Sequence, residues 1–459
     1  EATLTADLSS EAESAGGAGD FGDGGEMAAN GLIATNTVLS GAAAYIKNSV
    51  VTTLGSGDIT VSAENTETIE AMVVNATTSG EKAIGATLAF NTVGWLPQNI
   101  LFQAIDALIG TDIGDEHPAD TAAYIQSGSA HAAGAISVTA TNTAAITADV
   151  SNETTADASG LDGATGTSFG VLITMNKVSG RASAALGGNL QSGDDLTVSA
   201  QDKADITATI AIVSSSVVDN TNPFSNSDSF GVAVGIARND VRGGAEAGLD
   251  GASGTIGTNV TIAALEDATI TADLDVEAIA EGGTPFADSS SIAVGASIAT
   301  NIVLSKANAF VKNSNLTIGT PGIITLDAQN TSAILATVKT LITSNGTSIG
   351  ITLAFNTIGW DSQNILFNTI DALLGTDIGN EVPAETQAYI TNSTLHTAGE
   401  LKLTATSTAS IDAVIESSTT SIKKNTSASQ TISVGAIIAM NKISTRVRTF
   451  TDDSFILTV

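Results

Sequence analysis

A long internal repeat constrains the fold more than any other feature of the sequence. One stretch, starting at Ala89, reads AFNTVGWLPQNILFQAIDALIGTDIG, and a second, starting at Ala354, reads AFNTIGWDSQNILFNTIDALLGTDIG, an offset of 265 positions. Self-similarity at a fixed period is typical of stacked or strung architectures. The sequence therefore predicts a first long repeat unit over residues 1–265 and a second, truncated unit over residues 266–459. Because the chain begins without methionine, we expect it to be a segment of a longer protein.

The charge balance excludes several classes of partner. The 459 residues include 16 Lys and Arg against 48 Asp and Glu, a formal net charge of −32. Nucleic-acid binding needs clustered basic residues, and anionic membrane surfaces repel such a chain. No apolar run reaches the length of a membrane-spanning helix, which is about 20 residues, so we expect no direct membrane insertion. The absence of cysteine excludes disulfides and thiolate-bound zinc.

Alternating apolar and polar residues predict strands across most of the chain. The stretch ISVTATNTAAITADV at residues 136–150 places small or β-branched residues at every second position, the pattern of a half-buried strand. We expect an all-β fold, a parallel β-solenoid (β-helix) with one short amphipathic helical insertion per 265-residue repeat. If each short sub-unit makes two or three coils, one long unit adds roughly 45–60 Å. A string of immunoglobulin-like sandwiches is the alternative, but aromatics make up only 4% of the residues.

Asparagine recurs once in each short sub-unit, at spacings of 55 to 85 residues. These anchors are Asn36, Asn91, Asn176, Asn239, Asn301, Asn356 and Asn441. In stacked coils they could form side-chain ladders. In the alternative interpretation they take left-handed turn conformations.

The repeated phrase leads into an apolar stretch with helical periodicity. We expect helices over about 96–110 and about 361–375, each interrupting the strands. Such a helix could seal an irregular coil on the flank of the solenoid. Alternatively it contacts a neighbouring filament or partner, because aromatic clusters are common at the energetic centres of interfaces. The candidate interaction residues are Trp95, Leu101, Phe102, Ile105, Trp360, Leu366, Phe367 and Ile370.

Oxygen-bearing side chains follow each expected helix and are candidate Ca²⁺ ligands. They are Asp112, Asp115, Glu116 and Asp120 in the first unit, and Asp377, Asn380, Glu381 and Glu385 in the second. Their spacing matches no known calcium loop, and a solvated acidic turn is the alternative interpretation.

Catalytic motifs do not emerge from the sequence. It contains no nucleophile elbow, P-loop or zinc-type ligand spacing. We therefore expect no enzyme. The expected role is structural. Two other functions stay open as alternatives: a carbohydrate-binding or carbohydrate-cleaving β-helix of the tailspike type, and a calcium-stiffened adhesin stalk made of sandwiches.

Phrases such as GVAVGIARNDVRGGAEAGL and GASIATNIVLSKANAFVKNSNLTIG resemble repeats of very large bacterial surface proteins, the filamentous-adhesin and leukotoxin-type adhesins. The resemblance implies a secreted β-solenoid at the bacterial cell surface or outside the cell. It implies a structural role in adhesion, cell–cell contact or a sheath. Expected partners are neighbouring repeats, other copies in a filament, and glycans or proteins of a host or cell surface. The resemblance transfers no catalytic residue.

Overall fold

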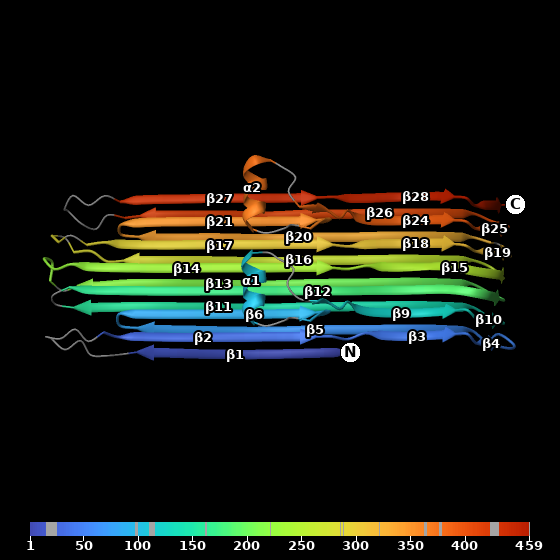
Figure 1. Cartoon of the computed structure of the whole chain (residues 1–459), viewed down its shortest axis with the longest axis horizontal. Helices are drawn as coiled ribbons and strands as arrows, with labels where there is room; N and C mark the ends of the chain where they lie inside the picture. Colours follow the sequence, from blue (N-terminus) through green and yellow to red (C-terminus); the bar gives the residue numbers. More distant parts are fainter. Residues whose placement is uncertain are drawn as a thin grey trace.

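A computed structural model of the chain shows long parallel strands in two large sheets (Figure 1). The residues that it describes are 1–14, 25–96, 100–109, 115–160, 163–220, 222–284, 286–287, 289–320, 322–361, 365–375, 379–422 and 431–458.

The first sheet contains seven strands in the described part of the chain, and every neighbouring pair is parallel. In spatial order these strands are β1 (Ala2–Ser14), β5 (Ile59–Ser79), β11 (Ile136–Gly160), β13 (Leu196–Asn220), β16 (Val260–Glu281), β20 (Ile324–Ser344) and β26 (Leu401–Ser421). Spatial order therefore follows chain order, and each strand of this sheet is separated from the next by a return through the second sheet.

The second sheet carries the return segments, and its pairs are also parallel. Its first part consists of β2 (Met27–Val38), β6 (Lys82–Val93), β12 (Ala164–Ser192), β14 (Ser227–Arg242), β17 (Ser291–Leu304), β21 (Thr347–Ile358) and β27 (Ile432–Ile443). Its second part consists of β3 (Ala42–Lys47), β4 (Val50–Thr52), β9 (Ala119–Gln126), β10 (Ser129–Ala132), β15 (Ala245–Ile256), β18 (Lys306–Lys312), β19 (Asn315–Ile318), β24 (Ala384–Thr391), β25 (Thr394–Thr397), β28 (Thr445–Asp452) and β29 (Phe455–Thr458). The 29-residue strand β12 runs through both parts without a break.

One strand of the first sheet and the following return segment form what we call a circuit. Successive asparagine anchors are register partners, so the 265 residues from Asn36 to Asn301 make four circuits. The prediction of two or three coils per sub-unit is therefore wrong, because each strand is longer than the sequence pattern indicated. At about 4.8 Å per circuit, four circuits add roughly 19 Å rather than 45–60 Å.

Apolar rows run through the space between the two sheets. One row in the first sheet contains Ile69, Ile146 and Ile206, each at most 1% exposed. Strand alternation points these residues inward and their neighbours outward, which explains the regular burial pattern of each long strand. Each fully buried aliphatic side chain contributes roughly 1.5–3 kcal/mol relative to an exposed one. The core is thin and regular, which is why small and β-branched residues suffice to fill it.

The anchoring asparagines form a continuous ladder inside this core. The Nδ2 of each asparagine donates to the Oδ1 of the next over the whole series, at donor–acceptor distances of 2.7–2.9 Å. Other asparagines take the left-handed turn conformation, namely Asn48, Asn313 and Asn392, with φ between 48° and 53°. The ladder interpretation is thus confirmed for the anchors, and the turn interpretation describes a different set of asparagines.

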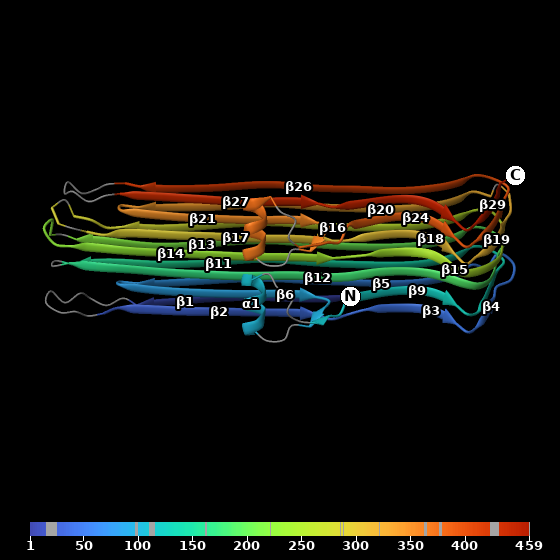
Figure 2. The same cartoon turned by 45° about the horizontal axis from the view of Figure 1, so that its top comes forward.

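The two helices lie within the ranges expected from the sequence. They are α1 (Ile100–Ile109) and α2 (Ile365–Leu374). Both lie on the outer face of the second sheet, one above the other in the direction of stacking (Figure 2). Each is enclosed by two antiparallel two-residue strands, β7 (Trp95–Leu96) with β8 (Asp115–Glu116), and β22 (Trp360–Asp361) with β23 (Asn380–Glu381). The predicted boundary between residues 265 and 266 falls inside β16, and both sheets continue across it.

Candidate functional site

The repeated sequence AFNT(V/I)GW forms the end of a strand and the turn that leads to each helix. Its glycines, Gly94 and Gly359, have φ of 71° and 69°. A Cβ atom at either glycine would lie within 2.2 Å of a backbone carbonyl oxygen, that of Ser179 or Ser444. Only glycine allows this left-handed turn so close to the next strand. The turn ends the strand and directs the chain outward into the helix.

An apolar contact seats α1 on the second sheet. Side chains alternate between the two faces of a strand, so the residues that directly precede the ladder asparagines point away from the core between the sheets. Phe90 and Met175 therefore face the helix. They form a buried cluster with Ala107 of α1, and Ala104 and Ile173 pack against its edge. This small cluster fixes the position of α1 over β6 and β12.

A buried carboxylate of α1 anchors the same contact electrostatically. Asp106 is inaccessible to solvent. One of its oxygens lies 2.6 Å from Nζ of Lys177, and the other lies 2.8 Å from a guanidinium nitrogen of Arg238. Arg238 also donates to the backbone oxygen of Asp106 at 3.2 Å. Both cationic side chains are at most 2% exposed, so the carboxylate provides opposite charge for two buried cations.

The ion pairs extend along the sheet from Arg238. Asp240 is fully buried and lies 3.3 Å from Arg238 and 3.1 Å from Arg242. Burial alone would raise the pKa of Asp240, but the charges of Arg242, Arg238 and Lys177 outweigh it and lower that pKa to about 2. We call Asp106, Lys177, Arg238, Asp240 and Arg242 the helix anchor. It joins α1 to two neighbouring circuits.

Trp95 covers one side of the helix anchor. It is 4% exposed, and the centre of its ring lies 4.6 Å from Nζ of Lys177 and 5.1 Å from the guanidinium carbon of Arg242. These are cation–π distances. Trp95 thus packs inside the molecule, where it is not available as a surface contact.

The second helix repeats part of this arrangement. Asp371 is buried and lies 2.5 Å from Nζ of Lys442, which in turn lies 4.4 Å from the centre of the Trp360 ring. These residues stand 265 positions after Asp106, Lys177 and Trp95. The sequence analysis missed the helix anchor, although the recurrence of an Asp and a Lys at the repeat offset was a signal that could have revealed it.

The other predicted interaction residues differ in their solvent exposure. Leu366 and Phe367 of α2 are 66% and 41% exposed, whereas Ile370 and Ile105 are half-buried. The side chains of Leu101 and Phe102 lie outside the described residues. Leu373 and Leu374, which the prediction did not include, are also exposed on α2. The exposed apolar side chains of α2 therefore form its most accessible surface.

The candidate calcium ligands are spread over several elements. Asp112 and Asp377 lie outside the described residues. Asp115 and Glu116 are exposed in β8, and Asp120 is exposed in β9. Asn380 and Glu381 form β23, and Glu385 lies in β24.

Three of these carboxylates already have partners. Glu116 accepts a hydrogen bond from Ser179 at 2.7 Å, and Glu381 accepts one from Ser444 at the same distance. Glu385 lies 3.1 Å from Arg446. Among the described residues, no group of three or more His, Asp or Glu is arranged to hold a metal ion. Calcium binding stays a prediction.

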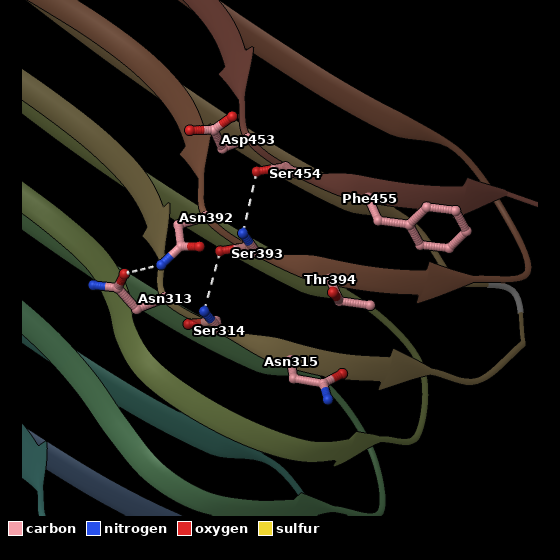
Figure 3. A pocket seen from close by; sticks show the side chains of 9 residues that line it. All are labelled: Asn313, Ser314, Asn315, Asn392, Ser393, Thr394, Asp453, Ser454 and Phe455. Atoms are coloured by element: carbon pink, nitrogen blue, oxygen red, sulfur yellow. Dashed lines mark hydrogen bonds between the residues drawn. The ribbon is translucent and has the colours of Figure 1, made fainter.

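A hollow of about 650 Å³ opens at three stacked turns of the later circuits, which join β18 to β19, β24 to β25 and β28 to β29 (Figure 3). Its polar groups bond mainly to one another. Nδ2 of Asn392 donates to Oδ1 of Asn313 at 2.7 Å, and the backbone N–H of Ser314 donates to Oγ of Ser393 at 3.1 Å. These bonds continue the stacking of the circuits at their turns, so the hollow is part of the stacked architecture and offers few free groups to a ligand.

Comparison with known proteins gives no further assignment: no family model, curated protein or solved structure matches the chain. In the described part of the chain, neither helix combines the length and the apolar character needed to span a membrane.

Proposed function

We propose that this chain is a structural segment of a giant extracellular repeat protein, folded as a parallel β-solenoid. Its role is to form a stiff fibre or filament at a bacterial cell surface, for adhesion, cell–cell contact or a sheath. In such a fibre the function is mechanical, and length is gained by adding circuits.

The asparagine ladder is the observation that carries this proposal. Six consecutive side-chain hydrogen bonds link seven asparagines across the whole described stack, and all of them except Asn441 are buried. A ladder of this kind stabilises only one strand register, because shifting a strand by a single residue would move its asparagine side chain out of the core. Backbone and amide bonds along one axis favour a stiff stack over a flexible string of beads.

Surface chemistry supports the same role. The net charge of −32 opposes unspecific clumping of neighbouring stacks. The helix anchor holds α1 on the sheet through buried ion pairs, as expected of a fixed structural element. The exposed apolar side chains of α2, including Leu366 and Leu373, supply a surface for lateral contacts with another fibre or with a surface protein.

Electron microscopy of this chain and of versions extended by one and two further 265-residue units tests the proposal. Particle width should stay constant at about 95 Å, the length of the 29-residue strand β12 at roughly 3.3 Å per residue. Height along the stacking axis should grow by roughly 19 Å per unit. Separate beads for each unit, or growth along the strand direction, would rule out the solenoid and with it the mechanical role.

A further inference from the structure

We infer that the outer face of the second sheet binds a second copy of this chain, so that two stacks pair side by side. The contact is made by what we call the apolar strip, which consists of four outward side chains from each of β6, β12, β14, β17 and β21. These are the first, third, fifth and seventh residues of the segments 82–88, 167–173, 230–236, 292–298 and 347–353. The inference rests on the proposed function as a fibre segment and specifies which face joins two fibres.

Strand register assembles the apolar strip into four rows that run along the stack. One of these rows contains Ile84, Phe169 and Val294. Of the 20 positions in the strip, 17 are apolar, two are threonine, and only Lys82 carries a charge. The inner face of the same strands already packs on the core between the sheets. A parallel sheet whose outer face is also apolar is normally covered on that face as well.

The apolar strip is open to solvent in the described structure. The side chains of Ile84, Phe169, Phe230 and Ile351 are 38–42% exposed. Along each strand the strip precedes the row of the helix anchor, so it lies beside α1 and α2, towards the turns at which β12, β14 and β17 begin (Figure 1). Exposed apolar patches larger than a few hundred Å² mark interaction sites.

The size of this face matches what a stable pair needs. Its rows continue onto the outer faces of β2 and β27, for example with Ile33 and Val434. Seven strands at about 4.8 Å and seven residues at about 3.3 Å give a face of roughly 34 Å by 23 Å, or about 780 Å². Specific interfaces bury about 800 Å² on each partner. The face also grows with each added unit, because Leu88 recurs 265 positions later as Leu353.

The distribution of charge selects a copy of this chain as the partner. On the outer face of the first sheet, β16 alone presents Asp267, Asp273, Asp275 and Glu277, whereas the apolar strip contains no acid. Two chains with a net charge of −32 repel each other over most of their surfaces, but a contact of strip against strip brings no carboxylates together. A basic partner finds no carboxylate on the strip, and an anionic lipid surface finds only Lys82.

The shape of the apolar strip fits the same partner. Its strands have the same spacing as those of a second copy, and the two strips can pack at the separation of about 10 Å that is typical of stacked sheets. Both helices lie to one side of the strip (Figure 2). A two-fold axis parallel to the stacking direction therefore places the helices of each copy beside the strip of the other. The two stacks then point in the same direction, so the contact lengthens as both fibres lengthen.

The Ile351→Glu variant places a charge in the third row of the apolar strip. Ile351 is 42% exposed, and both of its register partners are alanines, so the variant should keep the fold. The matched control is Val74→Glu on the outer face of the first sheet. Val74 is 40% exposed and lies between two serines. Ile351→Thr, which keeps the branched side chain and adds no charge, is the second variant.

Analytical ultracentrifugation of the 459-residue chain over a range of concentrations, at low and at high salt, tests the inference together with electron microscopy of the same samples. The chain and Val74→Glu should form side-by-side pairs, more strongly at high salt, which screens the repulsion between acidic chains. Ile351→Glu should weaken pairing by at least about tenfold, because pairing buries its charge without a partner. Ile351→Thr should weaken it less. Circular dichroism checks the fold of each variant, and Ile351→Thr carries the comparison if Ile351→Glu is unstable.

Three outcomes would overturn the inference. They are a monomer at all concentrations, oligomers that form only end to end, and equal association of Ile351→Glu and Val74→Glu. Binding of a monomeric chain to vesicles of neutral phosphatidylcholine, weakened by Ile351→Glu, would also overturn it, since the strip would then take lipid. A smooth stack that stays monomeric would leave the proposed fibre role intact, whereas a beaded particle would remove the proposed function itself.

Discussion

Asp106→Asn should release α1 from the sheet while leaving the stacked circuits in place. The substitution removes one negative charge and keeps the shape of the side chain. It leaves Lys177 and Arg238, each at most 2% exposed, without the carboxylate that compensates them. Asp240 still pairs with Arg238 at 3.3 Å.

The magnitude follows from the burial of these groups. Removing one member of a buried ion pair costs roughly 3–5 kcal/mol, because the remaining charge stays desolvated. The equivalent change at α2, Asp371→Asn, leaves Lys442, which is 19% exposed and can reach water. We expect a smaller cost there of roughly 1.5–3 kcal/mol, typical of a hydrogen bond to a charged group. The two helices thus provide an internal comparison.

Hydrogen exchange measures this effect directly, because it reports the opening of one element without requiring the whole chain to unfold. Amide protection of α1 should fall by at least about a hundredfold in Asp106→Asn, the factor that corresponds to roughly 3 kcal/mol, and by less for α2 in Asp371→Asn. Protection of β13 and β16 should not change in either variant.

A double substitution serves as the control. Replacing Asp106 and Lys177 together by Leu and Met removes both members of one ion pair and should restore part of the lost protection, since apolar replacements of buried pairs are often neutral. Unchanged protection of α1 in Asp106→Asn would refute the reasoning, because the helix would then be held by its apolar contacts alone.

Three further predictions concern a buried pair of acidic residues, the asparagine ladder and the turn at Gly94. Glu266 and Asp202 are register partners on neighbouring strands, and neither side chain is accessible to solvent. Burial raises the pKa of Asp202 from 3.8 to about 6, and burial and then the charge of Asp202 raise that of Glu266 well above its usual value. The folded state therefore holds extra protons, and stability falls as pH rises from about 4 through 6, by roughly 3 kcal/mol for Asp202 alone. In Glu266→Gln the free energy of unfolding, measured by urea titration at several pH values, should depend less on pH. The same pH dependence as in the unchanged chain would contradict this prediction. Asn176→Ala breaks two ladder bonds and should cost roughly 2–4 kcal/mol in urea titration, about twice the effect of Asn36→Ala at the end of the ladder; equal effects would argue against a ladder. Gly94→Ala should cost at least about 1–2 kcal/mol for the left-handed backbone, and a melting temperature equal to that of the unchanged chain would show that the turn relaxes.

Local sequence patterns determined much of the architecture. Alternation of small and β-branched residues predicted strands, and the 3.6-residue period after Trp95 predicted a helix within the range where α1 lies. The seven asparagines at the same place in each sub-unit allowed two interpretations, a ladder or left-handed turns, and the structure shows the ladder because stacking brings equivalent positions together. These features follow from neighbours along the chain or from the repeat itself, which is why the sequence displays them.

The length of each circuit and the helix anchor were decided only by the tertiary structure. Alternation shows which face of a strand is buried, but it does not show where the strand turns back. The stretch from Ala164 to Ser192 therefore forms one strand rather than several short ones. The partners of Asp106 lie 71 and 132 residues further along the chain. They meet because two neighbouring circuits bring Lys177 and Arg238 under the same helix, and a buried charge finds its compensation only once the stack is formed.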